Sequence, residues 1–209
     1  TITSYESIKY AKTDEGTSVY ADALCGDGSS MVTEFIYWSD YYNSIISPFY
    51  SYSTGRTKET LRSSQVTCRD IDDDGYIEIP EDTSSKKQSS EITSQNWVNY
   101  GNTVLSHKCY SFSCKRDGYI LVIDDDDFSK VQANYDSESR KLTIIDKKNK
   151  SNVFEIVTLI NSNYSVNDPK YKDYTMIMKN SGFVYLAKVN KSSDIDINIQ
   201  TLKDMIKVY

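Results

Sequence analysis

The stretch Asp70-Ile71-Asp72-Asp73-Asp74-Gly75-Tyr76-Ile77-Glu78-Ile79-Pro80 places carboxylates at alternate positions ahead of a glycine. Calcium takes about six to eight oxygen ligands, and a loop with acidic residues at its first, third and fifth positions can fold around one ion. Asp70, Asp72 and Asp74 have this spacing, and Gly75 follows where such a loop must turn sharply. The stretch therefore predicts a calcium-binding loop.

Two completions of the ligand set fit the spacing. In an EF-hand, Tyr76 would give its backbone carbonyl and Glu81 would be the bidentate ligand. The β-branched residues before the loop and Pro80 after it argue against flanking helices, so we expect the loop to join two strands. Glu78 is then the last acidic ligand. The expected ligands are Asp70, Asp72, Asp74 and Glu78 with the Tyr76 carbonyl.

A second interpretation of the same stretch needs no metal. Asp and Gly residues form turns in which the carboxylates accept hydrogen bonds from their own backbone. Calcium binding and a bare solvated turn both stay open at this point.

The composition favours β structure. The chain has 209 residues, 38% of them hydrophobic and 26% charged, with 18 Tyr. Strand formers outnumber strong helix formers. We expect an α+β fold that is mostly antiparallel β, in one large or two small domains.

The polar stretch at 83–95 is interpreted as a linker or long loop between two domains. Residues 1–82 are expected to form a β meander like a propeller blade, and 96–209 an antiparallel sheet covered by one or two short helices. Helices are expected at 171–179 and from Ile199 onward. Strands are expected at 7–12, 18–24, 32–38, 44–46, 64–69, 97–105, 108–113, 119–123, 131–135, 141–145, 153–159 and 184–189.

Four cysteines allow three disulfide pairings. Cys109 and Cys114 fall in one expected strand, about 16 Å apart, which is beyond disulfide reach. Cys25 and Cys68 could bridge, and four free thiols fit equally well. There is no C-x-x-C motif to support a zinc or thioredoxin-like site.

Charge and hydropathy argue against several partners. The net charge is −6, and no dense Lys/Arg cluster exists for a nucleic acid. The lysines at 147–150 are interpreted as a hairpin tip. No run of about 18 apolar residues exists to span a membrane. The chain begins at Thr1 without Met, as a mature or trimmed product would, so any signal peptide or lipid-bearing cysteine would lie upstream.

Catalytic motifs are scarce, which favours a non-catalytic protein and leaves an enzyme as the open alternative. The acidic run Asp124–Asp127 is interpreted as a solvated loop or the first turn of a short helix. His107 has no serine or cysteine motif positioned for it. No phosphate-binding glycine loop occurs.

Several segments resemble a group of uncharacterised lipoproteins of Gram-positive anaerobic bacteria. The segments are Gly26-Asp27-Gly28-Ser29-Ser30-Met31-Val32-Thr33-Glu34-Phe35-Ile36-Tyr37-Trp38, Pro48-Phe49-Tyr50, 69–80, Asp117-Gly118-Tyr119 and Val184-Tyr185-Leu186-Ala187-Lys188. The resemblance implies an extracytoplasmic, lipid-anchored protein with propeller-like Asp-x-Asp-x-Asp-Gly strand units. The resemblance implies no established activity for this chain, and the lipidated cysteine lies outside this sequence.

Two functions follow as hypotheses. The first is a non-catalytic module at the cell surface that binds a cell-wall polymer, a glycan or a protein through exposed tyrosines, with the Asp70 loop as a calcium clip. The densest tyrosine group is Tyr41, Tyr42, Tyr50 and Tyr52, with Trp38 beside it in sequence. Packing between strands is the alternative role of these side chains. The second function is a polysaccharide hydrolase with paired carboxylates.

Overall fold

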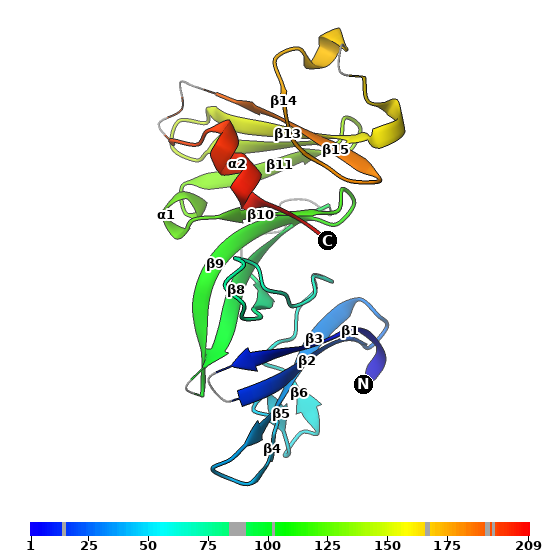
Figure 1. Ribbon diagram of the computed structural model, residues 1–209, viewed down its shortest axis with the longest axis vertical. Helices are drawn as coiled ribbons and strands as arrows, with labels where there is room; N and C mark the ends of the chain where they lie inside the picture. Colours follow the sequence, from blue (N-terminus) through cyan, green and yellow to red (C-terminus); the bar gives the residue numbers. More distant parts are fainter. Residues whose placement is uncertain (14–15, 84–90, 102, 166–167, 191–192, 194) are drawn as a thin grey trace. The chain divides into compact units, whose positions relative to one another are not determined.

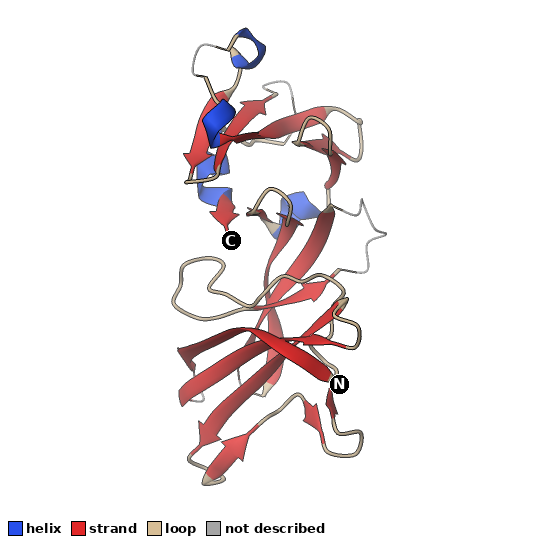
Figure 2. Ribbon diagram, turned by 90° about the vertical axis from the view of Figure 1, so that its right-hand side faces the viewer, coloured by secondary structure: helices blue, strands red, loops and turns tan. Residues whose placement is uncertain are grey.

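The computed structural model describes residues 1–209 except 14–15, 84–90, 102, 166–167, 191–192 and 194. The chain forms two compact units, coloured along the sequence in Figure 1. Unit 1 comprises Thr1–Ser84 and Gln95–Cys109, and unit 2 comprises Ser85–Ser94 and Tyr110–Tyr209. Strands dominate both units, as Figure 2 shows, and every strand pairing among the described residues is antiparallel.

Unit 1 is built on a four-stranded sheet with the order β1-β2-β3-β4. A second pairing joins β7 to β8, with Ile79 opposite Val98. A two-stranded ribbon is formed by β5 and β6. The bounds are β1 Ile2–Thr13, β2 Gly16–Cys25, β3 Ser30–Ser39, β4 Ser44–Ile46, β5 Tyr50–Ser51, β6 Arg56–Thr57, β7 Ile79–Asp82, β8 Ile92–Gly101 and β9 Val104–Cys114.

The core of unit 1 is aromatic, because the inward face of β2 and β3 carries Tyr20 and Phe35. Their rings lie 4.8 Å apart, and the Tyr100 ring of β8 lies 4.9 Å from Phe35. Ile77 and Ile79 belong to the same cluster. The end of the acidic loop is thereby anchored to the core of its own unit.

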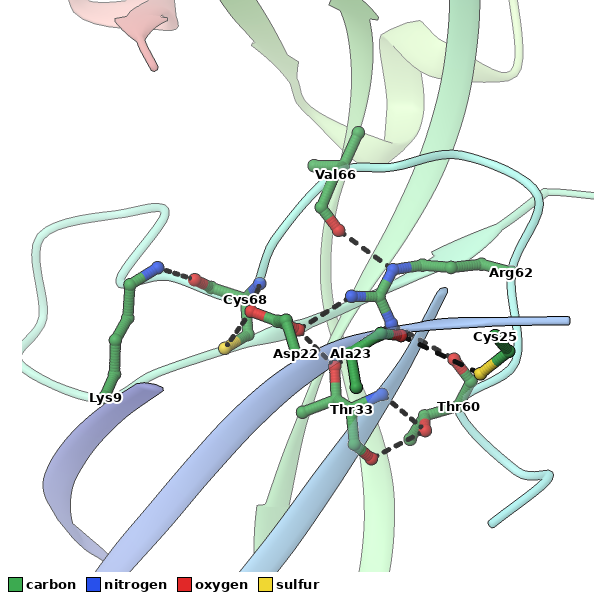
Figure 3. Close-up of polar contacts among 9 residues, drawn as sticks. All are labelled: Lys9, Asp22, Ala23, Cys25, Thr33, Thr60, Arg62, Val66 and Cys68. Atoms are coloured by element: carbon green, nitrogen blue, oxygen red, sulfur yellow. Dashed lines mark hydrogen bonds and ion pairs between the residues drawn. The ribbon is translucent and has the colours of Figure 1, made fainter. Parts of the chain in front are cut away.

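A buried polar network holds the segment that leads into the acidic loop (Figure 3). Arg62 donates to Asp22 Oδ1 at 2.8 Å, to Thr33 Oγ1 at 3.0 Å and to the Val66 carbonyl at 2.9 Å. The Cys68 backbone donates to Asp22 Oδ2 at 2.9 Å. Both side chains of the Asp22–Arg62 pair are fully buried. Non-local side chains therefore fix the backbone up to Cys68.

Unit 2 carries a five-stranded sheet with the order β11-β12-β13-β15-β14. In the same unit β10 pairs with β16 and with β9, where Ile120 lies opposite Ser113. The bounds are β10 Tyr119–Ile123, α1 Asp125–Phe128, β11 Val131–Asp136, β12 Lys141–Asp146, β13 Asn152–Ile160, the 3₁₀ turns Asn161–Asn163 and Pro169–Tyr171, β14 Thr175–Lys179, β15 Phe183–Val189, α2 Ile199–Met205 and β16 Ile206–Val208.

Helix α2 packs against β14 and β15 and buries Leu202 in the core of unit 2. Its first turn is capped by Asn198, whose side chain accepts from the backbone N–H groups of Gln200 and Thr201. The antiparallel, β-rich fold with a C-terminal covering helix is confirmed. Neither helix described in the structure is long and apolar enough to cross a membrane.

A second buried acid–base pair stabilises unit 2. Asp117 accepts from Arg140 Nε at 2.7 Å and from the Tyr135 hydroxyl at 2.8 Å, and its side chain is fully buried. The Arg140 guanidinium lies over the Phe183 ring, 4.7 Å from its centroid. Gly118 follows at φ 70° in the turn that joins β9 to β10, a backbone conformation that favours glycine.

Three structural expectations were wrong. Residues 64–69 form no strand, because buried side chains take the hydrogen bonds of Val66 and Cys68 that a strand partner would need. Residues 171–179 form no α-helix, since Thr175–Lys179 pairs with β15. The described sheets are open and form no propeller.

The division of the chain also differs from the expected one. Residues 92–95 belong to β8, so they are not part of a linker, and 96–109 lie within unit 1. The physical reason is that β8 and β9 are long strands, and each contributes residues to both units. The rest of the expected linker includes 84–90, which lie outside the described residues.

Candidate metal centre

The acidic loop is closed by a backbone bridge between Arg69 and Glu78. The Arg69 N–H donates to the Glu78 carbonyl at 3.0 Å, and the Glu78 N–H donates back at 2.9 Å. Strand β7 begins at the next residue, Ile79, and contains Pro80. Glu81 accepts from Asn96 Nδ2 at 2.9 Å. The strand after the loop rules out the EF-hand completion, whose exit segment would be a helix.

The loop keeps its shape through hydrogen bonds to its own backbone. Asp70 accepts from the N–H groups of Asp74 at 3.1 Å and Gly75 at 2.8 Å, one on each carboxylate oxygen. Gly75 has φ 90°, a conformation that side-chain-bearing residues rarely adopt. Asp74 accepts from the Tyr76 N–H at 2.9 Å. These bonds are those expected of an Asp/Gly turn.

The turn also brings together three carboxylates. One oxygen from each of Asp70, Asp72 and Glu78 lies within 4.8 Å of the other two. Two ligands on opposite sides of a calcium ion lie roughly 4.6–5.2 Å apart, because each Ca–O bond is about 2.3–2.6 Å. The three carboxylates can therefore hold one metal ion.

Glu78 is the feature that a bare turn does not explain. Its side chain is fully buried, and Oε2 accepts from the Ile71 N–H at 3.0 Å. Oε1 is also buried and has no hydrogen-bond partner among the residues that the structure describes. Burying a carboxylate oxygen without a donor is costly, and a turn of this shape could be made without it. A cation next to Asp70 and Asp72 would supply the missing partner of Glu78.

Asp74 has a different role from the three grouped carboxylates. Its Oδ2 forms an ion pair with Lys108 Nζ at 2.5 Å, and Asp72 Oδ2 lies 3.3 Å from the same ammonium. The Lys108 hydrogen bond lowers the pKa of Asp74. Asp74 and the Tyr76 carbonyl stay predictions as ligands. Sequence reasoning missed Lys108, because no local pattern links a residue of β9 to a loop more than thirty residues earlier.

Burial raises the pKa of Glu78 to about 7; the Ile71 N–H opposes the shift, and the neighbouring carboxylates add to it. A carboxyl group whose pKa is higher in the folded than in the unfolded state contributes to the stability of the folded protein at low pH. That contribution is lost as the pH rises through the folded-state pKa. In chelator, the free energy of unfolding should therefore fall by roughly 2–3 kcal/mol between about pH 5 and pH 8. Denaturant unfolding of wild type and Glu78→Gln tests this. Parallel pH profiles for the two proteins would contradict it.

The predicted tyrosine group lies on the surface. Tyr41 is 88% exposed and Tyr52 is 87% exposed, and Tyr42 and Tyr50 are also exposed. Tyr41 and Tyr42 form one edge-on ring pair, and Tyr50 and Tyr52 form another. Packing in the core between strands is therefore not the role of these side chains.

The outward face of the four-stranded sheet of unit 1 carries Trp38, which sequence reasoning noted, and further apolar side chains that it missed. Strand register places Tyr10 beside Val19, and Val19 beside Ile36. Trp38 lies opposite Ile45 on the same sheet, and both are exposed. Alternate apolar residues in β1 and β3 were the available signal, since one face of a strand repeats every second residue.

Each unit also carries a groove. In unit 1, a groove of about 890 Å³ is lined by Glu34, Tyr50, Arg56 and Lys58 among others. In unit 2, a groove of about 600 Å³ is lined by Asp127, Lys130, Asp146, Lys147, Lys148, Ile195 and Asp196. Asp70, Asp72 and Glu78 are not among the lining residues of either groove.

The remaining expected sites are placed as follows. The acidic run forms α1, so its interpretation as the first turn of a short helix is confirmed. The lysines at 147–150 lie between β12 and β13, as a hairpin tip. None of the four cysteines, all of which lie among the described residues, forms a disulfide bond, so Cys25 and Cys68 are not bridged.

Comparison of the chain with protein-family models, with curated proteins and with solved structures finds no match.

Proposed function

We propose that this chain is a non-catalytic binding module of the cell exterior whose acidic loop holds one calcium ion as a structural clip. The proposal is carried by one observation: beside Asp70 and Asp72, Glu78 Oε1 is buried and has no hydrogen-bond partner in the described part of the chain. Calcium suits three oxygen ligands on a loop whose other positions stay open to water and backbone carbonyls. Extracellular modules commonly bind calcium with Kd values of about 10⁻⁴–10⁻³ M.

The binding role is supported by the exposed aromatic side chains of unit 1. Tyr41, Tyr42 and Tyr52 are strongly exposed on turns, and Trp38 and Tyr10 are exposed on the sheet. Flat aromatic rings contact sugars and anchor protein interfaces at low entropic cost. A cell-wall polymer, a glycan or a protein is therefore the partner class we propose. Attachment to the cell surface through an upstream lipid anchor belongs to the same proposal.

The hydrolase alternative finds less support among the described residues. Glycoside hydrolysis needs two carboxylates that face the substrate, one acting as an acid. In the groove of unit 2, Asp127 is paired with Lys130 at 3.0 Å. Asp146 is buried and accepts from the Lys148 N–H at 2.7 Å. Of the three carboxylates that line this groove, Asp127 and Asp146 are thus occupied by interactions within the chain.

Thermal unfolding of the full chain tests calcium binding. Trp38 and Trp97 are the two tryptophans and both belong to unit 1, so tryptophan fluorescence reports this unit. Calcium at tenfold to hundredfold above Kd should raise the Tm by roughly 3–8 °C over that in chelator. Asp72→Asn and Glu78→Gln should abolish the shift. Asp126→Asn, in the exposed acidic run, is the matched control and should keep it.

Equal Tm values in calcium and chelator for the wild type would overturn the calcium clip. A shift that persists in Glu78→Gln would place the ion elsewhere. Equal shifts with magnesium and calcium would contradict the choice of calcium, because magnesium prefers shorter bonds and a stricter octahedral geometry.

A further inference from the structure

Lys108 brings a positive charge into the acidic loop from a distant strand. It lies on β9, and its ammonium contacts Asp74 Oδ2 at 2.5 Å and Asp72 Oδ2 at 3.3 Å. The three side chains are each about 30% exposed. This is a half-buried charge cluster, in which Coulomb interactions are stronger than on an open surface.

Asp72 belongs to two groups at once. It is one of the three carboxylates that can share a metal ion, and it is also a partner of the Lys108 ammonium. A divalent ion bound to Asp72 would therefore lie close to a fixed positive charge. Like charges at such separations repel, and a carboxylate shared by two cations interacts less favourably with each of them.

We propose that Lys108 is a tethered cation that competes with the divalent ion for Asp72 and so lowers the affinity of the site. This inference rests on the proposed calcium site. In the metal-free chain the ammonium offsets the repulsion between Asp72 and Asp74 and keeps the loop folded. When the ion binds, Asp72 turns toward Asp70 and Glu78, and Lys108 loses one of its two carboxylate partners. The site is thereby set to respond to high calcium concentrations.

Calcium titration calorimetry on the full chain at low ionic strength tests the competition. Lys108→Met should bind calcium roughly three- to tenfold more tightly than the wild type, and the gain should shrink as salt is added. Lys108→Arg keeps the charge and should bind with nearly wild-type affinity. Lys203→Met removes an exposed lysine of α2 and controls for net charge; its affinity should match that of the wild type.

A second measurement needs no variant and stands even where Lys108→Met fails to fold. Acylation of lysines on the wild type, read by mass spectrometry, reports how available each lysine amine is for reaction. Saturating calcium should raise the acylation rate of Lys108 several-fold relative to Lys203, because the ion takes over Asp72. An unchanged or lower rate at Lys108 with calcium bound would overturn the competition.

The outcomes separate this inference from the calcium site itself. Tighter binding by Lys108→Met supports both. Binding by the wild type with equal or weaker affinity in Lys108→Met leaves the calcium site standing and overturns the competition. Absence of calcium binding in the wild type and in Lys108→Met overturns the proposed function, and the inference with it.

Discussion

Replacing Arg62 by methionine is expected to lower the free energy of unfolding of unit 1 by about 3–5 kcal/mol. Arg62 donates to Asp22, Thr33, Thr60 and Val66, and its side chain has no exposure to solvent. The variant leaves the Asp22 carboxylate buried with no cationic partner. A charge in that position is costly, and the whole stability of a domain is only about 5–15 kcal/mol.

Denaturant unfolding followed by tryptophan fluorescence measures this effect in unit 1. The double variant Asp22→Leu with Arg62→Met should be less destabilised than the sum of the single variants, because no unpaired charge stays buried. Asp127→Ala breaks the more exposed pair with Lys130 and should cost at most about 1 kcal/mol. A loss of less than about 1 kcal/mol in Arg62→Met would show that the pair does not hold the segment.

Replacing Asp117 by alanine should destabilise unit 2 by about 2–4 kcal/mol. The change leaves the Tyr135 hydroxyl and the Arg140 guanidinium without their buried acceptor. Part of the cost is recovered because the Arg140 side chain is 19% exposed and stays over the Phe183 ring. The expected loss is therefore smaller than that for Arg62.

Hydrogen exchange read by mass spectrometry resolves the Asp117 effect, because unit 2 contains no tryptophan. Amides of β10, β12 and β15 should exchange faster in Asp117→Ala, while those of β2 and β3 should keep their wild-type protection. Tyr135→Phe removes one hydrogen bond and should cost only about 1 kcal/mol. Unchanged protection of unit 2 in Asp117→Ala would contradict the account of this pair.

Local patterns predicted much of the fold. Alternating apolar residues located most of the long strands, and β4 and β10 have the predicted bounds. The helical spacing of Ile199, Leu202, Met205 and Ile206 located α2, although Ile206 begins a strand. Side-chain periodicity is a short-range signal, so these elements were accessible from the sequence.

Interactions between distant residues account for what could not be predicted. Residues 64–69 are β-branched and polar in a strand-like pattern, yet Arg62 and Asp22 take their backbone hydrogen bonds. Thr175–Lys179 becomes a strand through pairing with β15. Tertiary contacts override local propensity in both cases.

The candidate site was predictable only in part, for the same reason. The spacing of acidic residues in the loop identified Asp70, Asp72 and Glu78, the three carboxylates that the fold brings together. The burial of Glu78 depends on the core of unit 1, because its two sequence neighbours, Ile77 and Ile79, pack into that core. The ammonium of Lys108 comes from β9. Neither the burial of Glu78 nor the ion pair with Lys108 can be predicted from the sequence of the loop alone.

The proposed calcium clip depends on a cation that completes the coordination of Glu78. Calcium titration calorimetry of the wild type, Glu78→Gln and Asp126→Asn measures this dependence. We expect one ion per chain for the wild type and for Asp126→Asn, and no binding for Glu78→Gln. Equal binding by Glu78→Gln, or no heat of binding in the wild type at about millimolar calcium, would contradict it.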